Sequence, residues 1–268
     1  MNLFQYFTSE FSAVGVDSPE AEAKLVIESL YQNDAFKDVE KIDLKKFYEV
    51  LERRRKREPI QYILGKAFFF NSEFIVSPAV LIPRPETEIM VEKLIEILPE
   101  NGVMADIGCG SGCIGISVAL ERPDVEVYSF EISSEALKIA RLNAEKLHAS
   151  NIHFIESDLF ASCPANIRFD AVGANLPYVP LSDYAVCQQE VRDYEPKLAL
   201  TADDDGLEII LRCAGELAGF MKRGGKVFFE IDPSQDRRLQ TYLDGTGWKK
   251  AEIIKDYTDR SRFVSAEF

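Results

Sequence analysis

Short apolar runs alternate with helical patterns from about residue 102 onward, and this alternation limits the fold more than any other feature. The pattern predicts strands at 102–108, 125–131, 151–157, 169–175 and 226–232, with helices at 111–123, 133–149, 206–225 and 234–245. Such alternation is typical of a mainly parallel sheet with helices on both faces. The last two runs, 248–257 and 262–268, lie too close for a crossover helix and predict an antiparallel pair.

Residues 1–70 have a different pattern and predict a small helical domain. Ser18 and Pro19 suit a helix start, and a second helix follows at 43–59. We interpret the run Arg53–Arg57 as a solvated last helical turn whose cations complement the helix dipole. Residues 71–83, rich in aromatic and β-branched side chains, predict a β-hairpin connector, and residues 84–268 form the α/β domain.

Charge and composition narrow the function classes. The net charge is −14, and residues 71–268 carry 20 Lys and Arg against 33 Asp and Glu, the reverse of a phosphate-binding surface. Five cysteines form no evident disulfide framework, and with two histidines they predict no metal site. No leader peptide or membrane-spanning run is visible, so we expect a cytoplasmic protein.

The segment "MADIGCGSGCIGIS" predicts a ligand-binding loop between a strand and a helix. Gly108, Gly110 and Gly112 let a ligand approach the backbone amides at the helix start. Glu131, at the end of the next strand, is placed to accept hydrogen bonds from two ribose hydroxyls. Asp106, just before the loop, favours a cationic amino-acid cofactor over a pyrophosphate. Residues 110–115 also match the dinucleotide pattern G-x-G-x-x-G, so a nicotinamide cofactor and a turn without ligand stay open.

The ends of the third and fourth predicted strands carry further polar residues. Asp158 can accept a hydrogen bond from an adenine amino group while Leu159 covers the ring. In "NLPY", the Asn175 side chain and the Leu176 carbonyl offer two acceptors for one NH₂ group. Pro177 makes the loop rigid, and the Tyr178 ring offers a flat wall. These residues predict a clamp for a planar nitrogen that is to be methylated.

The chain resembles the peptide chain release factor glutamine methyltransferase family, the PrmC/HemK type. The resemblance rests on "EPIQYILG", "VLIPRPETE", "DIGCGSGCIGIS", "EISSEALKIARLNA", "FDAVGANLPYVP", "VRDYEPKLALTADDDGLEII" and "DYTDRSRFV", which follow the family's order over nearly the whole chain. It implies the fold of a class I S-adenosylmethionine-dependent methyltransferase: a Rossmann-like seven-stranded sheet with the last strand antiparallel, and a small N-terminal helical domain.

The resemblance also implies roles for the site residues. S-adenosyl-L-methionine would be held by Gly108, Cys109, Gly110, Ser111, Gly112, Glu131, Asp158, Leu159 and Asn175. The glutamine of a Gly-Gly-Gln tripeptide in class I release factors would be held by Asn175, Leu176, Pro177 and Tyr178. The N-terminal helices would recognise this protein substrate. We expect a monomer that contacts neither nucleic acid nor membrane directly.

Two departures from the family pattern leave alternatives open. Leu176 stands where the family usually has a proline, and Asp232 stands where it tends to have a glycine. Asn-Leu-Pro-Tyr is also similar to the motif of rRNA adenine dimethyltransferases, so methylation of a nucleic-acid amino group is the second hypothesis. A non-catalytic binding protein that keeps the fold is the third.

Overall fold

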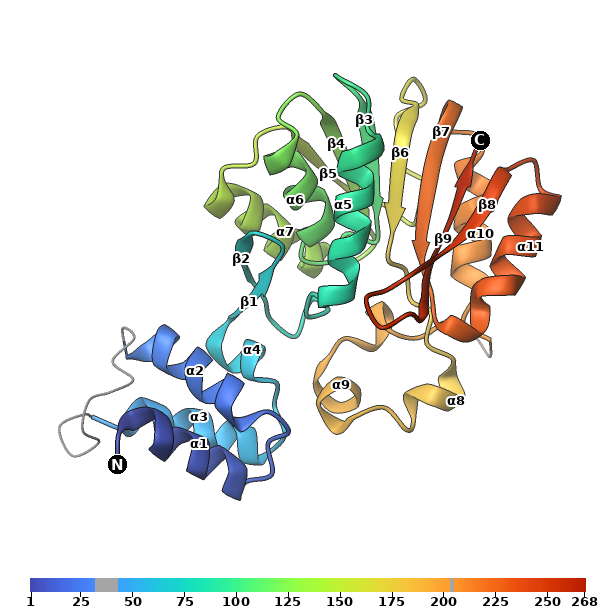
Figure 1. Cartoon of the computed structure of the whole chain (residues 1–268). Coiled ribbons are helices and arrows are strands. Elements are labelled where there is room, and N and C mark those ends of the chain that lie inside the picture. The colour runs from blue at the N-terminus through green and yellow to red at the C-terminus, as the bar shows by residue number, and fades with distance from the viewer. Residues whose placement is uncertain (32–42, 203–204) are drawn as a thin grey trace. The chain divides into compact units, whose positions relative to one another are not determined.

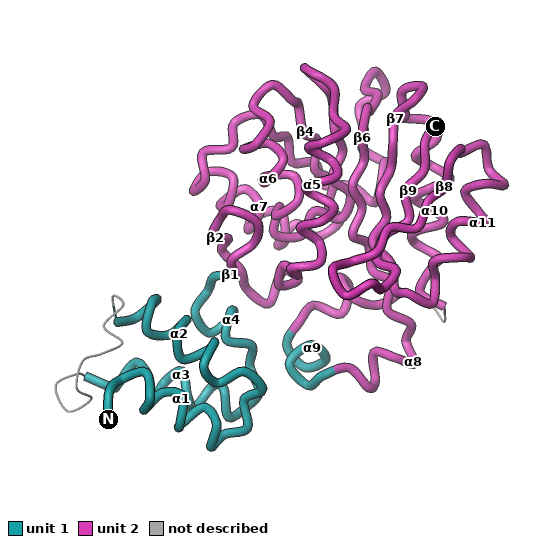
Figure 2. The backbone as a smooth tube through the Cα atoms, viewed as in Figure 1, with its two compact units in different colours: residues 1–66, 188–194 teal, residues 67–187, 195–268 magenta. Residues whose placement is uncertain are grey.

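The computed structural model describes residues 1–31, 43–202 and 205–268. The chain divides into two compact units, one formed by Met1–Lys66 with Gln188–Tyr194 and the other by Ala67–Cys187 with Glu195–Phe268 (Figure 2). The sequence predicted a continuous N-terminal domain, and it did not predict that a distant segment would join it. Among the described residues, no helix is both long enough and apolar enough to cross a membrane.

The first unit is helical, as predicted for the N-terminal region. Its helices are α1 (Leu3–Ala13), α2 (Pro19–Leu30), α3 (Lys45–Arg55), α4 (Ile60–Leu64) and α9 (Gln189–Tyr194) (Figure 1). Phe7 and Phe47 stack with their ring centroids 3.6 Å apart, and Phe11 meets Phe47 edge-on. These buried aromatic rings give the unit a core of its own.

Arg53, Arg55 and Lys56 of the basic run are exposed as predicted, but Arg54 is not. The Arg54 side chain is only 4 % exposed and donates to both carboxylate oxygens of Glu22, at 2.8 and 3.0 Å. Arg54 and Arg57 also reach Glu190 of α9, at 3.6 and 2.7 Å. The solvated interpretation is therefore wrong for Arg54, because acidic partners from elsewhere in the chain compensate its burial.

The second unit contains a seven-stranded sheet with the predicted alternation of strands and helices. The strands are β3 (Val103–Ile107), β4 (Glu126–Glu131), β5 (Ile152–Glu156), β6 (Phe169–Ala174), β7 (Met221–Glu230), β8 (Lys249–Lys255) and β9 (Ser261–Glu267). Their order is β5-β4-β3-β6-β7-β9-β8. The first five strands are parallel, and β9 is antiparallel to both β7 and β8, which confirms the predicted fold class.

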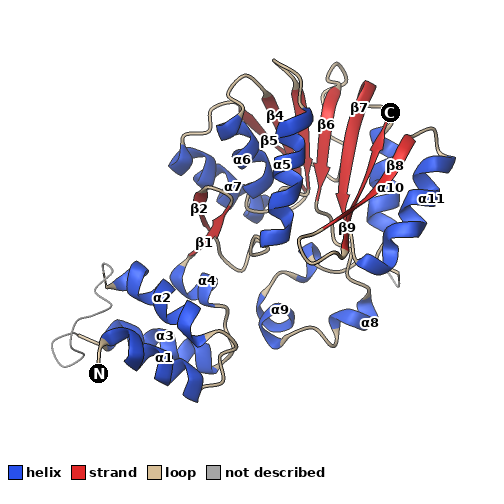
Figure 3. Cartoon of the chain, viewed as in Figure 1, coloured by secondary structure: helices blue, strands red, loops and turns tan. Residues whose placement is uncertain are grey.

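Helices cover both faces of this sheet (Figure 3). Neighbouring strand residues point to opposite faces, so Phe228 joins the core beneath α5 (Glu88–Ile97) and α6 (Cys113–Glu121), whereas Phe229 joins the core beneath α10 (Glu208–Leu217) and α11 (Asp236–Gly245). The helix α7 (Ser134–Leu147) packs on β5 and β4. The remaining short helices are η2 (Pro85–Thr87), α8 (Leu181–Tyr184), η3 (Lys197–Ala199) and η4 (Pro233–Gln235).

Two segments differ from the sequence prediction. The hairpin is formed by β1 (Lys66–Phe69) and β2 (Ser72–Ile75), so it begins before residue 71 and ends well before residue 83. The helix predicted at 206–225 ends at Leu217, and β7 already begins at Met221. The pairing of β6 with β7 shifts in register, and this shift accommodates the residues around Gly224. The apolar pattern of the sequence predicted those residues as part of the helix.

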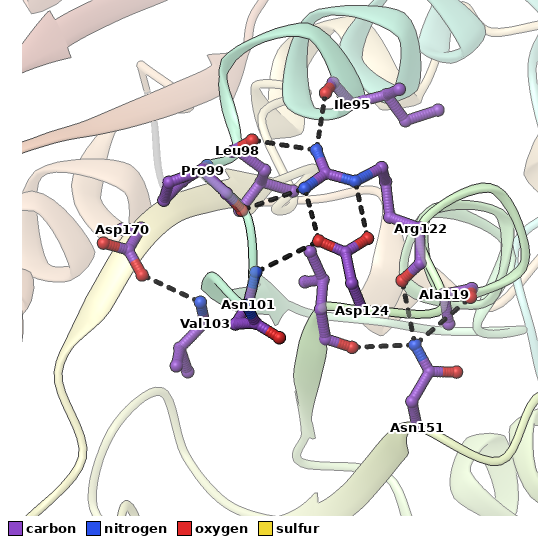
Figure 4. A network of polar contacts seen from close by, with 11 residues as sticks. Ile95, Leu98, Pro99, Asn101, Val103, Ala119, Arg122, Asp124, Asn151 and Asp170 are labelled. Carbon is purple, nitrogen blue, oxygen red and sulfur yellow. Dashed lines mark hydrogen bonds and ion pairs between the residues drawn. The ribbon is translucent and has the colours of Figure 1, made fainter.

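A polar network fixes the amino-terminal edge of the sheet, opposite the ends where the predicted site residues lie (Figure 4). Arg122 donates to the carbonyls of Ile95, Leu98 and Pro99 at 2.8–3.2 Å, and it pairs with Asp124. The Ile95 carbonyl lies in the last turn of α5, and the Leu98 and Pro99 carbonyls follow it, so all three lack a partner within the helix. Arg122 therefore anchors the end of α5 beside the start of β4.

We expect the substitution Arg122→Met to lower the free energy of unfolding by about 1–3 kcal/mol, because it removes charged donors from partly buried carbonyls while keeping an apolar stem. Urea denaturation measures the change. The control is Arg141→Met, since the exposed Arg141 makes one 3.4 Å contact with the Phe154 carbonyl. We expect this control to stay within about 0.5 kcal/mol of wild type. Equal losses in both variants would contradict the anchoring role.

Candidate active site

The candidate site lies where the strand order of the sheet reverses. β3, the first strand of the sheet in the chain, has β4 on one side and β6 on the other. Ile107 at the end of β3 pairs with Ala174 at the end of β6, so the residues that follow them leave the sheet together. Ligands of open α/β sheets bind at this switch point, outside the carboxyl ends of the strands.

A cavity of about 410 Å³ occupies this place. Most of the predicted site residues line it: Gly108, Cys109, Gly110, Ser111, Glu131, Asp158, Leu159, Asn175, Leu176 and Pro177. Residues that were not predicted also line it, among them Thr87, Arg84 and Arg212. Gly112 and Tyr178 do not belong to the lining, although both lie next to residues that do. The volume falls within the range of sites for small ligands and cofactors.

Gly108 joins the glycine loop to the Asn-Leu-Pro-Tyr turn. Its φ is +71°, and a Cβ atom placed there would lie 3.0 Å from Leu176 Cδ2 and 3.5 Å from the Asn175 carbonyl oxygen. Only glycine suits both this backbone conformation and this contact. Leu176, the departure from the family's usual proline, therefore fills the space next to Gly108 with a side chain that is 4 % exposed.

Glu131 holds the glycine loop in place. Its Oε2 accepts a hydrogen bond from the Gly110 amide at 3.0 Å, and its Oε1 accepts one from the Ser133 amide at 2.9 Å. Each carboxylate oxygen can accept a further hydrogen bond, and Glu131 lines the cavity. The predicted role of Glu131 toward ribose hydroxyls fits this placement and stays a prediction.

Asp158 and Leu159 close another part of the cavity wall. Asp158 forms an ion pair with Arg212 of α10, which the sequence did not predict. Leu159 is buried and has a φ of +47°, which turns the chain sharply after β5. The cavity lining thus combines the apolar side chain of Leu159 with the charged pair, and the predicted role of Asp158 and Leu159 toward an adenine ring stays a prediction.

Asn175 is held by residues that sequence reasoning missed. Its Nδ2 donates to Thr87 Oγ1 at 3.3 Å, Thr87 Oγ1 donates to Glu230 Oε2 at 2.7 Å, and the Tyr178 hydroxyl donates to Glu230 Oε1 at 3.2 Å. Thr87 lies in "VLIPRPETE", and Glu230 is an acid that ends the apolar run "KVFF". An acidic residue at the end of an apolar strand is the feature of the sequence from which Glu230 could have been predicted as a site residue.

Tyr178 does not present its ring to the cavity in this structure. The ring packs against the core beneath α10 and α11, and burial together with the nearby Glu230 carboxylate raises the pKa of its hydroxyl. Tyr178 is absent from the cavity lining, and its role as a flat wall for a planar substrate stays a prediction. The other three residues of the turn, Asn175, Leu176 and Pro177, line the cavity as predicted.

Asp106 does not line the cavity, although we expected it to suit a cationic cofactor there. Its side chain is fully buried, and its Oδ2 accepts from the Gly115 amide at 3.0 Å in the first turn of α6. Burial raises the pKa of Asp106 to about 7, although the bond from Gly115 opposes this. Asp106 thus anchors α6 to β3, because side chains alternate between the faces of a strand.

Asp232, the other departure from the family pattern, caps a helix. Its carboxylate accepts from the Ser234 amide at 2.9 Å, while Gln235 reaches back to the Asp232 amide at 3.0 Å. Gln235 also donates to the Tyr178 carbonyl at 2.9 Å, which ties the cap to the turn after β6. Of the family motif around residues 191–210, residues 203 and 204 lie outside the described part of the chain.

The sheet order, the glycine loop and the cavity define a class I S-adenosylmethionine-dependent methyltransferase. A family model described as "Methyltransferase small domain" matches residues 85–193, and one described as "PrmC N-terminal domain" matches residues 2–65. A ribosomal protein L11 methylase from Lactobacillus delbrueckii has a similar fold, with a TM-score of 0.52 at 20 % identity over 72 % of this chain and 82 % of that chain.

Relatives in sequence narrow the class further. The release factor glutamine methyltransferase of Chlorobaculum tepidum is 33 % identical over 95 % of this chain and 92 % of its own length. That of Leptospira interrogans is 39 % identical over 81 % of this chain and 78 % of its own length. The chain belongs to the release factor glutamine methyltransferase family, and its cofactor is S-adenosyl-L-methionine.

We expect Gly108→Ala to destabilise the ligand-free chain by about 2–3 kcal/mol, because the new Cβ atom meets both an unfavourable φ and the Leu176 side chain. Gly110→Ala is the matched control, since Gly110 also has a positive φ but a Cβ atom placed on it would have no atom within 4 Å. We expect this control to lose about 1 kcal/mol. Urea denaturation compares the two, and equal losses would show that the Leu176 contact is unimportant.

We expect Asp106→Asn to flatten the pH dependence of stability. Between about pH 4, where an unfolded aspartate titrates, and about pH 7, the folded chain keeps a proton that the unfolded chain has lost. The stability that this proton contributes therefore falls as the pH rises through that window. The asparagine side chain of the variant does not ionise, so the variant should gain about 1–3 kcal/mol relative to wild type from pH 5 to pH 8. If the free energy of unfolding of wild type and variant changed in parallel with pH, the raised pKa of Asp106 would be refuted.

Proposed function

We propose that the chain transfers a methyl group from S-adenosyl-L-methionine to the side-chain amide nitrogen of the glutamine in the Gly-Gly-Gln motif of class I release factors. The observation that carries the proposal is the 33 % identity to the Chlorobaculum tepidum relative, named for this activity, over 92 % of that relative's length. The acceptor-bearing turn after β6, beside the cavity, supports the same chemistry.

The residues around the cavity suit the cofactor. The loop Gly108–Gly112 would hold its amino-acid part, Glu131 its ribose, and Asp158 with Leu159 its adenine. At Gly110, which lines the cavity, a Cβ atom would meet no atom within 4 Å, so this position leaves open space for the cofactor, and the Glu131 carboxylate offers it acceptors. When bound, S-adenosylmethionine supplies a methyl group on a positively charged sulfur, which makes that carbon electrophilic.

The protein's part in the reaction is to present the nitrogen. An amide nitrogen is a poor nucleophile because its lone pair is delocalised into the carbonyl. The Asn175 Oδ1 atom and the Leu176 carbonyl would each accept one N–H bond, and both bonds strengthen as the nitrogen becomes tetrahedral and more positive. Holding nitrogen and carbon in line supplies further rate enhancement, and the proton can leave to water after the transfer.

The first unit is proposed to recognise the release factor. It has an aromatic core of its own and matches a separate family model, so it can serve as a binding module. We propose a monomeric enzyme that acts in the cytoplasm, where release factors function.

Methylation of a nucleic-acid amino group is the less favoured function. Residues 71–268 carry 33 acidic against 20 basic side chains, which opposes binding of a phosphate backbone. Similarity to a putative rRNA methylase of Clostridium thermocellum, at 13 % identity and a TM-score of 0.52, concerns the fold alone.

Mass spectrometry of a purified release factor after incubation with the chain and S-adenosylmethionine tests the proposal. We expect one added methyl group, about 14 Da, on the Gly-Gly-Gln glutamine, and none on a Gly-Gly-Glu variant that lacks the amide. Asn175→Ala should lower the rate at least about 100-fold, because one acceptor for the nitrogen is lost. The exposed Asn166→Ala serves as control and should keep the wild-type rate. Methyl transfer to rRNA alone would overturn the proposal.

A further inference from the structure

Three separate segments of the second unit converge on the side chain of Asn175. Thr87 comes from η2, which precedes α5, and Glu230 from the end of β7, while Asn175 itself follows β6. The links run from Asn175 Nδ2 to Thr87 Oγ1 at 3.3 Å, and from Thr87 Oγ1 to Glu230 Oε2 at 2.7 Å. Nothing in the reaction itself requires Thr87 or Glu230 to touch the substrate.

The chemistry of these groups sets a direction along the chain of hydrogen bonds. A hydroxyl can donate one hydrogen bond, and a carboxylate oxygen only accepts, so the Thr87 hydroxyl donates its hydrogen bond to Glu230. Toward Asn175 it then has only lone pairs to offer. The NH₂ side of the Asn175 amide must face Thr87, and the carbonyl oxygen, Oδ1, must face the other way. Among the described residues, no group donates a hydrogen bond to this oxygen.

Burial makes this direction hard to reverse. Thr87 is 2 % exposed and Glu230 is 1 % exposed, so water has little access to replace either partner. The Glu230 carboxylate also accepts from the Tyr178 hydroxyl at 3.2 Å. Burial raises the pKa of the Glu230 carboxyl above its ordinary value, and the hydrogen bond from Thr87 and the positive charge of Arg262 only partly offset this rise. Arg262 is itself held by Asp256 at 3.3 Å.

The orientation of the Asn175 amide decides which substrate atom the site accepts. With Oδ1 outward, the site offers an acceptor and suits a nitrogen that carries N–H bonds. With the amide turned by half a rotation, its NH₂ group would face the substrate NH₂ group, and two donors would oppose each other. A surface asparagine can adopt either orientation, because its two ends have nearly the same shape.

We propose that Thr87 and Glu230 are positioning residues that hold the Asn175 amide with its oxygen toward the substrate nitrogen, and that this polarity selects an N–H donor as the methyl acceptor. The proposal rests on the proposed function only for the identity of the substrate. The hydrogen-bond direction concerns this chain's own residues, and it can be measured without substrate.

The first test compares Thr87→Val with Thr87→Ser in the full-length chain. Valine keeps the shape but removes the hydroxyl, whereas serine keeps the hydroxyl. For the Gly-Gly-Gln substrate we expect Thr87→Val to lower kcat/KM about 10- to 100-fold and Thr87→Ser to stay within about 3-fold of wild type. Calorimetry with S-adenosylhomocysteine should give dissociation constants within about 2-fold for all three proteins. Wild-type kcat/KM in Thr87→Val, or a parallel loss of ligand affinity in that variant, would overturn the positioning role.

The second test reads the amide directly by NMR of chain labelled with ¹⁵N-asparagine. The Asn175 side-chain resonances are identified by their absence from the Asn175→Ala spectrum. We expect Thr87→Val to shift them and to speed the exchange of their protons with water, while Thr87→Ser leaves them near the wild-type position. Unchanged resonances in Thr87→Val would contradict the proposal. Because no substrate is present, this result stands apart from the proposed function, which fails instead if wild-type chain does not methylate Gly-Gly-Gln.

Discussion

The parallel pairing of β3 with β6 is the contact on which the rest of the site depends. Ile107 and Ala174 are partners at the ends of these strands, so Gly108 and Asn175 emerge next to each other although they are 67 positions apart in the sequence. A Cβ atom on Gly108 would lie 3.0 Å from Leu176 Cδ2, so the close approach of the two loops favours glycine at this position. A single wall thus carries both the cofactor loop and the acceptor-bearing turn.

Buried polar groups then fix the loops and side chains that the sheet brings together at the site. Glu131 fastens the glycine loop, Asp106 fastens α6 behind it, and Glu230 with Thr87 orients Asn175. Each of these carboxylates accepts hydrogen bonds from partners that lie elsewhere in the chain. Such bonds are strong in a buried setting and costly to leave unmade, so they fix side-chain orientations that packing alone would leave free.

Much of this could be predicted from residue patterns, and the exceptions have physical causes. The period of apolar residues predicts each parallel strand, because strands buried on both faces must be apolar throughout. Apolar periodicity gave a wrong helix end at 206–225, because Met221 fits a helical face and a strand equally well. Arg54 looked solvated because its partners, Glu22 and Glu190, are remote in sequence. The direction of the Asp106 side chain depends on which face of the sheet each strand residue takes, and this cannot be predicted from the local sequence pattern.

The sequence by itself determined the fold class, the glycine loop, the family and the positions at which polar residues end the strands, because these follow from local periodicity and short motifs. Only the tertiary structure decided that Asp106 faces α6, that Tyr178 packs into the core, and that Thr87 and Glu230 meet at Asn175. The reason is that hydrogen-bond partners are chosen by proximity in space. That proximity arises from sheet order and packing, which join residues far apart in the chain.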